Sequence, residues 1–272
     1  MGNLAGHTIL LTGASGGIGS AMAQELARQQ ATVMLVGRAA ESLESTRQRI
    51  TAVGGNAITV VADLLNPADR ERLAVMASEL PSGLQGLVHC AGINEFALLE
   101  GQGESAIEAQ LSVNLLAPVL LTRAVLPALH KAGNATVLFV GSTFGTIGYP
   151  GYTVYCASKA GLRGFSEALR RELADSPICI LYFAPRATRT AINPPQVEAM
   201  NQALGNAMDL PEAVAQAAVK HYLAGKPAQC YFGWPEKLFA RMNQIMPAIV
   251  DNAISKQLAI IKQYASRQGR GS

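Results

Sequence analysis

The chain has 272 residues, of which 49% are hydrophobic and 15% are charged, and its formal net charge is +3. This length and composition suit one large α/β domain with a substantial core. The near balance of 22 basic and 19 acidic residues argues against a nucleic-acid-binding protein, which usually needs a concentrated basic face. The four cysteines form no CxxC pair, so we expect neither a metal site nor a disulfide framework, and we expect a cytoplasmic location.

Neither a signal peptide nor a membrane-spanning helix is expected. The first residues run directly into an apolar segment, without the basic region and cleavage site that a signal peptide carries. No stretch of about 20 residues, the length that a spanning helix needs, is free of polar groups.

Apolar runs of strand length recur along the chain at regular intervals. They are nearly continuous rather than alternating, which is typical of parallel strands covered by helices on both faces. Helical patterns separate them, so the order of elements predicts a Rossmann-like α/β fold with a doubly wound parallel sheet. The predicted strands comprise residues 7–12, 31–37, 56–62, 86–92, 135–141, 178–184 and, more weakly, 229–234.

The starts of two helices can be read from the residues. Apolar side chains at helical spacing over 17–30 predict a helix directly after the first strand. Asn66 followed by Pro67 is a typical N-cap and first helical residue, so a helix is expected from there to about Leu80.

A glycine-rich turn, TGASGGIG, joins the first strand to the first helix. Gly13, Gly17 and Gly19 permit a tight turn and let the backbone approach a bound pyrophosphate. The N-terminus of the following helix offers N–H groups and the positive end of its dipole to phosphates. Such a turn alone can be no more than a turn, but its place after the first strand of an alternating series predicts a dinucleotide site.

The residues after the second and third strands bear on which dinucleotide binds. A basic residue at the end of the second strand accommodates the 2′-phosphate of NADP. Arg38 stands there and predicts NADP(H), although it could also be a solvent-facing arginine before a helix. Asp63 ends the third strand, where it could accept a hydrogen bond from the adenine amino group, cap the next helix, or do both.

Tyr155 and Lys159 are four residues apart in YCASK, so a helix places them on one face. An unperturbed tyrosine has a pKa of about 10, and a nearby cation lowers it. Beside a nicotinamide, this pair predicts proton transfer to accompany hydride transfer. Ser142 follows the fifth strand, where its hydroxyl could hold the substrate oxygen. Asn114 is a polar residue in an apolar helical run, and is either functional or a buried amide satisfied by backbone.

With these features in this order, the chain resembles the short-chain dehydrogenase/reductase family over most of its length. The matching features are TGASGGIG, Asp63, the Ala-Gly of HCAG, Asn114, Ser142 and YCASK. The resemblance implies that an Asn–Ser–Tyr–Lys tetrad is catalytic, with Tyr155 as the acid/base and Ser142 orienting the carbonyl. It also implies that Lys159 lowers the tyrosine pKa and binds the nicotinamide ribose, and that Asn114 holds a water for proton relay.

The resemblance extends to the expected binding residues. Among them, Thr188 and Thr190 fall where family members contact the nicotinamide carboxamide and the phosphates. The substrate is expected to contact Ser142, Phe144, Tyr149 and Arg186. The cofactor is expected to contact Gly13, Ser15, Gly17, Ile18, Gly19, Arg38, Asp63, Leu64, Cys90, Ala91, Gly92, Tyr155, Lys159, Pro185, Thr188 and Thr190.

Two positions depart from the family pattern. The usual NNAG is HCAG here, so Cys90 replaces an asparagine whose amide helps to tie the central strands. We expect a changed strand contact with cofactor binding retained, and a packed core position for His89. The usual Pro-Gly after the sixth strand is Pro185-Arg186. Arg186 could meet the pyrophosphate or an anionic part of the substrate, or it could be an exposed loop charge.

Two segments break the alternation of strands and helices. Residues 186–208 are polar and too long for a simple turn, which predicts a substrate loop. A Rossmann-fold catalytic domain is expected at 1–233, followed by an amphipathic helical extension at 234–272 with two apolar stripes separated or kinked at Pro247. The extension could pack on its own domain or on another subunit, cover a hydrophobic substrate, or lie on a membrane surface through residues 234–268.

These features predict an NADP(H)-dependent oxidoreductase that reduces a ketone of a hydrophobic or acyl-type substrate, such as a 3-oxoacyl thioester, to an alcohol. The same site could work as an alcohol dehydrogenase in the oxidative direction. A non-catalytic dinucleotide sensor or scaffold is the alternative from another class, although the complete tetrad argues against it. By analogy with the family, helices at about 107–132 and 153–174 are expected to pair subunits into a homodimer or homotetramer.

Overall fold

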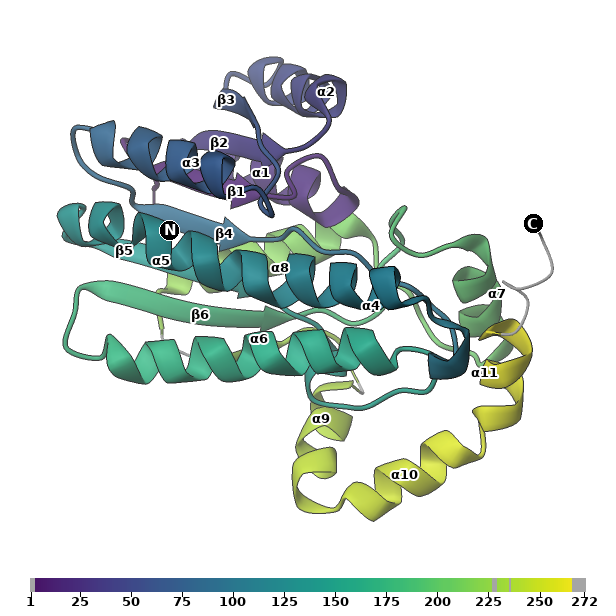
Figure 1. Ribbon diagram of the computed structural model, residues 1–272. Coiled ribbons are helices and arrows are strands. Elements are labelled where there is room, and N and C mark those ends of the chain that lie inside the picture. The colour runs from purple at the N-terminus through teal and green to yellow at the C-terminus, as the bar shows by residue number, and fades with distance from the viewer. Residues whose placement is uncertain (1–2, 227–228, 235, 266–272) are drawn as a thin grey trace.

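The computed structural model describes residues 3–226, 229–234 and 236–265. The seven predicted strands form one parallel sheet, which confirms the doubly wound fold (Figure 1). Its order is β3-β2-β1-β4-β5-β6-β7, so the direction of winding reverses between β1 and β4, where such folds bind ligands. The strands are β1 (Thr8–Thr12), β2 (Thr32–Gly37), β3 (Asn56–Val61), β4 (Gly86–His89), β5 (Ala135–Val140), β6 (Ile178–Ala184) and β7 (Gln229–Tyr231).

Helices cover both faces of the sheet, and successive strand residues point into two separate cores. Leu11 and Leu35 pack against one layer of helices, and their neighbours Leu10 and Met34 pack against the other. Burial on both faces explains why the strands read as continuous apolar runs. The first layer holds α1 (Gly17–Arg28), α2 (Ala40–Thr51) and α8 (Pro211–Ala224), and the second holds α3 (Pro67–Glu79), α5 (Ala117–Lys131) and α6 (Thr153–Glu172).

Helix α3 begins where the sequence predicts. The side-chain oxygen of Asn66 accepts a hydrogen bond from the backbone N–H of Ala68 at 3.0 Å, and Pro67 is the first helical residue. Without this cap, the N–H of Ala68 would have no hydrogen-bond partner, because the first N–H groups of a helix find none within the helix. This local rule therefore fixes the direction in which the chain leaves β3.

A long helical stretch runs along the second face as α4 (Glu104–Leu111), a π-helical turn η2 (Ser112–Leu116) and α5. These 28 residues are long and apolar enough to cross a bilayer by length and composition alone. Leu121 and Leu129 are fully buried against the sheet, however, which is the pattern of a core helix.

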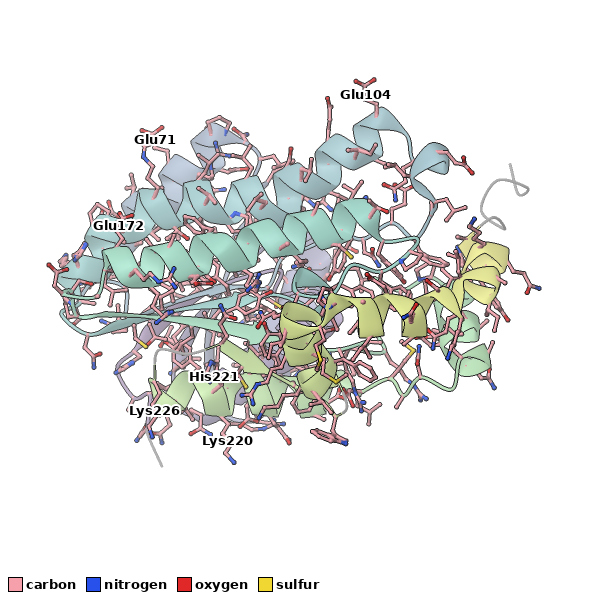
Figure 2. All side chains as sticks on the ribbon, turned by 90° about the horizontal axis from the view of Figure 1, so that it is seen from below. Glu71, Glu104, Glu172, Lys220, His221 and Lys226 are labelled. Atoms are coloured by element: carbon pink, nitrogen blue, oxygen red, sulfur yellow. The ribbon has the colours of Figure 1, made fainter. Side chains whose placement is uncertain are left out.

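Over its described residues 236–265, the C-terminal extension forms three helices instead of the two predicted stripes. Pro247 separates the first two as expected, because it is the first residue of α10. The predicted stripe after Pro247 is divided between two helices, because α10 ends at Ser255 and α11 begins at Leu258. Figures 1 and 2 show these helices crossing the end of the molecule that carries α7. The remaining elements are α7 (Pro195–Ala203), α9 (Glu236–Ile245), α10 (Pro247–Ser255), α11 (Leu258–Ala265) and two short 3₁₀ turns, η1 (Leu99–Gly101) and η3 (Thr143–Gly145).

Candidate active site

A cavity of about 740 Å³ opens at the carboxyl ends of the central strands. It runs from the glycine-rich turn past Tyr155 to the C-terminal extension. Of the predicted site residues, Asn114 alone is missing from its lining, because its side chain is fully buried behind the wall. The predicted residues that line the cavity are Gly13, Ser15, Gly17, Ile18, Gly19, Arg38, Asp63, Leu64, Cys90, Ala91, Gly92, Ser142, Phe144, Tyr149, Tyr155, Lys159, Pro185, Arg186, Thr188 and Thr190.

The glycine-rich turn needs glycine for two different reasons. Gly13 has a φ of +66°, and a Cβ there would lie 2.7 Å from the Cα of Ala91. A Cβ on Gly19 would overlap the carbonyl oxygen of Gly13. The turn can therefore fold back on itself beside β4 only without side chains. Gly16, the N-cap of α1, supplies no side-chain hydrogen bond, so the helix N-terminus faces the cavity without a cap of its own.

The opposite wall offers a hydroxyl that fits a phosphate-bearing cofactor. Thr190 Oγ1 is buried at the cavity and has no hydrogen-bond partner among the described residues. Its methyl group lies against Gly17, where an added Cβ would come within 2.5 Å of it. Buried polar atoms are rarely left without a partner. We call the glycine-rich turn and the N-terminus of α1 the glycine cradle. A dinucleotide pyrophosphate bound in this cradle would accept a hydrogen bond from the Thr190 hydroxyl that faces it.

At the far end of the cradle, Arg38 is exposed and lines the cavity. Within the part of the chain that the structure describes, its guanidinium has no hydrogen bond or ion pair. It is thus available to a 2′-phosphate. The geometry equally permits the solvent-facing alternative, so the NADP preference stays a prediction.

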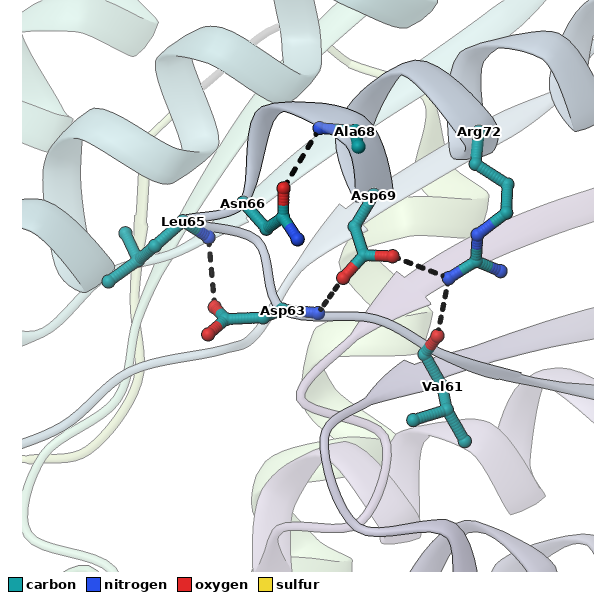
Figure 3. A network of polar contacts seen from close by, with 7 residues as sticks. All are labelled: Val61, Asp63, Leu65, Asn66, Ala68, Asp69 and Arg72. Atoms are coloured by element: carbon teal, nitrogen blue, oxygen red, sulfur yellow. Dashed lines mark hydrogen bonds and ion pairs between the residues drawn. The ribbon is translucent and has the colours of Figure 1, made fainter.

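Asp63 does not cap the next helix, which corrects one of its two predicted roles. Asn66 is the cap, and the Asp63 carboxylate instead accepts from the N–H of Leu65 at 2.9 Å (Figure 3). The N–H of Asp63 donates to Asp69 at 2.8 Å, and Asp69 pairs with Arg72 at 2.7 Å. This network holds Asp63 at the cavity wall, where contact with adenine stays a prediction.

The chemical groups converge from the end of β5 and from α6. Ser142 follows β5, while Tyr155 and Lys159 share one face of α6 as predicted. The Ser142 hydroxyl accepts from the N–H of Phe144 at 3.1 Å, which fixes its position. Lys159 Nζ donates to the carbonyl of Val140 at 3.3 Å and lies 5.7 Å from the centroid of the Tyr155 ring.

Burial dominates the ionisation of this pair. It raises the pKa of Tyr155 to about 12 and lowers the pKa of Lys159 to about 8, because a buried site disfavours the charged forms. Hydrogen bonding with Ser142 acts against burial on the Tyr155 pKa. The net shift of the Tyr155 pKa is therefore upward, because burial outweighs the lowering expected from the nearby cation of Lys159. Tyr155 holds its proton at neutral pH, as a proton donor must.

Asn114 lies in the π-helical turn, behind Gly92 and close to Lys159. Its Oδ1 accepts from the N–H of Ile93 at 2.8 Å, and its Nδ2 donates to the Ile93 carbonyl at 2.9 Å and to Ser158 Oγ at 3.1 Å. The alternative of a buried amide satisfied by backbone thus describes its side chain. A role in proton relay stays a prediction, and π-helical turns are frequent at functional sites.

Near Cys90, the structure shows a contact between strand ends that the sequence did not reveal. The Thr12 hydroxyl accepts from the N–H groups of Cys90 and Ala91 at 3.1 and 3.2 Å. This ties the end of β1 to the turn beside the cofactor site. His89 is 2% exposed, stacks on Phe139 with 4.9 Å between ring centroids, and burial lowers its pKa to about 3, so it is a packed core residue.

Arg186 is not the exposed loop charge that one alternative described. Its side chain is 16% exposed, and its guanidinium binds both carboxylate oxygens of Asp209 at 2.7 and 2.9 Å. A third nitrogen donates to the carbonyl of Trp234 at 3.1 Å. No pattern in the sequence indicated Asp209 as the partner, because the two residues are 23 positions apart.

The substrate end of the cavity is apolar. The rings of Phe144 and Tyr149 stack with centroids 5.0 Å apart, and Tyr152 lies beside them. Val197 and Met200 of α7 line the same end. The substrate loop predicted at 186–208 therefore lines the cavity, as expected.

The C-terminal extension completes this wall, a contribution that the sequence left open among several alternatives. Phe239 and Ile254 line the cavity, and the Tyr149 hydroxyl donates to Gln257 Oε1 at 3.3 Å. In α11, Ile261 is fully buried in a cluster with α7. The extension thus packs on its own domain and covers the substrate end at the same time. Its apolar stripes were the available signal, but they did not indicate which surface they cover.

Known proteins share this arrangement. The family model for short chain dehydrogenases matches residues 7–201. The chain is 32% identical to a ketoacyl reductase, HetN, of a Nostoc species over 81% of this chain and 76% of that one. It is 35% identical to nodulation protein G of Rhizobium meliloti, covering 83% and 96% of the two chains. The crystal structure of a short chain dehydrogenase from Burkholderia cenocepacia in complex with NADP superposes with a TM-score of 0.77 at 27% identity, covering 86% and 99%. The chain belongs to the short-chain dehydrogenase/reductase family of oxidoreductases.

Proposed function

We propose that this protein is an NADP(H)-dependent ketoreductase that converts a hydrophobic or acyl-type ketone to an alcohol. The observation that carries the proposal is the meeting of Ser142, Tyr155 and Lys159 between a glycine cradle and an apolar pocket. The ketoacyl reductase named among the relatives and the NADP complex among the solved structures support it. They do not identify the substrate of this chain.

Each polar group has a definite part in the proposed reaction. A bound NADPH supplies a hydride to the carbonyl carbon. The Ser142 hydroxyl donates a hydrogen bond to the carbonyl oxygen and orients it. Tyr155, protonated because burial raises its pKa, gives its proton to that oxygen as negative charge develops. Lys159 would hold the cofactor ribose and stabilise the phenolate that remains, and Asn114 keeps the backbone of Ile93 in place.

The proposed substrate class follows from the lining of the pocket. Phe144, Tyr149 and Ile254 offer apolar surface. Arg186, which was expected to meet an anionic part of the substrate, is already paired with Asp209 in this structure. A neutral hydrophobic ketone or a 3-oxoacyl thioester of which the acyl chain enters the pocket fits better than a small polar sugar. Turnover of polar sugars in preference to acyl ketones in a substrate panel would refute this assignment.

Arg38 is proposed to set the preference for NADPH over NADH. A hydrogen bond to a charged group contributes about 1.5–3 kcal/mol, so Arg38→Asp is expected to shift the ratio of NADPH to NADH affinity about tenfold to hundredfold toward NADH. Titration of both cofactors by their fluorescence measures the ratio. Lys220→Asp makes the same charge change at an exposed position of α8 and should leave the ratio unchanged. An unchanged ratio of affinities in Arg38→Asp would show that Arg38 faces solvent and does not contact the cofactor.

The assembly and location of the protein stay predictions. Leu111 and Leu116, on the helices expected to pair subunits, are 38% and 50% exposed, and burial between subunits would cover them. Leu238, Ile245 and Ile249 of the extension are exposed as well. These apolar side chains could contact a membrane surface, so peripheral membrane association of a cytoplasmic protein stays a prediction. Sedimentation alone and with anionic vesicles tests both. A monomer mass contradicts the homodimer or homotetramer, and failure to pellet with vesicles contradicts membrane contact.

A further inference from the structure

The two ends of the substrate loop (186–208) are held together by backbone. The N–H of Arg189 donates to the carbonyl of Asp209 at 2.9 Å, and the N–H of Asp209 donates to the carbonyl of Ala187 at 2.9 Å. Thr188 and Asp209 form a parallel β-bridge. The chain therefore leaves β6 and returns to α8 through a narrow neck, and Asp209 is the residue at which it closes.

Arg186 adds a side-chain lock at this neck. Its guanidinium makes two parallel hydrogen bonds to the Asp209 carboxylate, and both side chains are only 16% exposed. Such bidentate pairs fix geometry as well as adding energy. The same guanidinium donates to the carbonyl of Trp234, which lies directly ahead of α9. One side chain thus joins the end of β6, the start of α8 and the start of the C-terminal extension.

The segments that meet at Arg186 build the substrate wall together. Val197 and Met200 of the substrate loop form one buried cluster with Ile261 of the extension. Gln257 of the extension binds Tyr149 beside them. A surface pair such as Arg47 and Glu44 differs, because it links two residues of α2 and both side chains are about 40% exposed.

We propose that Arg186 and Asp209 form a clasp that positions the substrate loop and the C-terminal extension as one wall of the substrate pocket. Arg186 is then a positioning residue and does not bind an anionic substrate. The glycine usual in the family at this place has no side chain that could make these three contacts. Because it concerns the substrate wall, the clasp rests on the proposed ketoreductase function, and its test includes a measurement that needs no activity.

The test compares Arg186→Ala and Asp209→Asn with Arg47→Ala, which removes an exposed arginine from a pair within one helix. With NADPH saturating, KM and kcat are measured on a neutral hydrophobic ketone and on a ketone that carries a carboxylate. In parallel, a broad-specificity protease digests each protein, and mass spectrometry locates cuts within 186–208. The digestion depends on the wall alone and would stand even if no ketone were turned over.

Both clasp variants are expected to raise KM for both ketones by about tenfold while kcat changes less than about twofold, because a loosened wall loses contacts that bind the substrate equally in the ground state and the transition state. Both should also be cut faster within the substrate loop, and Arg47→Ala should show neither effect. A rise in KM confined to Arg186→Ala and to the carboxylated ketone would overturn the clasp and make Arg186 a substrate ligand. Unchanged cleavage of the loop in both variants would also overturn it.

Discussion

Tyr155→Phe is expected to lower kcat for ketone reduction by about 10²–10⁴-fold, the usual contribution of a positioned proton donor. The change removes one hydroxyl and keeps the ring that packs near Phe144. The affinity for NADPH should therefore change less than about twofold, because the loss falls on the transition state. Stopped-flow reduction of a hydrophobic ketone, with NADPH binding measured separately, distinguishes the two quantities.

Tyr222→Phe is the matched control for this variant. Tyr222 is a buried tyrosine of α8, outside the cavity lining, with its hydroxyl 3.4 Å from the carbonyl of Gln85. The Tyr222→Phe variant should have the same kcat as the unaltered protein. A kcat within tenfold of that value in Tyr155→Phe would show that another group donates the proton. Tight NADPH binding without turnover by the unaltered protein on any ketone would instead favour a non-catalytic dinucleotide sensor.

Gly19→Ala is expected to weaken NADPH binding by about 100-fold, since displacing a binding loop by about 1 Å has effects of this size. The added Cβ would overlap the carbonyl oxygen of Gly13, so the turn must open. Crowding of this kind also costs about 1–3 kcal/mol of folding free energy. Titration with NADPH and thermal unfolding measure the two effects.

Gly101→Ala provides the comparison, because a Cβ on Gly101 meets no atom within 4 Å. Its cofactor affinity and unfolding temperature should match those of the unaltered protein. If Gly19→Ala bound NADPH as tightly as Gly101→Ala, the glycine-rich turn would not be the phosphate cradle.

The sequence was sufficient for features that depend on near neighbours. Strand positions followed from apolar runs, because a strand buried on both faces has no polar face to show. The cap at Asn66 and the shared face of Tyr155 and Lys159 followed from hydrogen bonding and spacing within one helical turn. The glycine pattern predicted the cradle, because few other residues fit a turn that meets its own backbone.

Some predictions from local sequence were wrong for a common reason. Of the two possible roles of Asp63, capping of α3 is excluded, because the predicted cap at Asn66 occupies that place and the Asp63 carboxylate binds the N–H of Leu65. The cation near Tyr155 was expected to lower its pKa, but desolvation prevails once the pair is enclosed. Spacing along the chain gives neither the depth of burial nor the choice among competing partners, and both are set when the layers close.

The sequence by itself determined the sheet, the glycine-rich turn and the chemical identity of the candidate catalytic groups. The tertiary structure alone decided which distant residues complete the site: Thr12 beside Cys90, Asp209 on Arg186, and Gln257 on Tyr149. It also decided that the C-terminal helices cover the apolar end of the cavity. An amphipathic stripe indicates that one face of a helix is buried, but it does not indicate the surface against which that face packs. Partners far apart in the chain are selected by the packing of whole elements, and no local pattern records that selection.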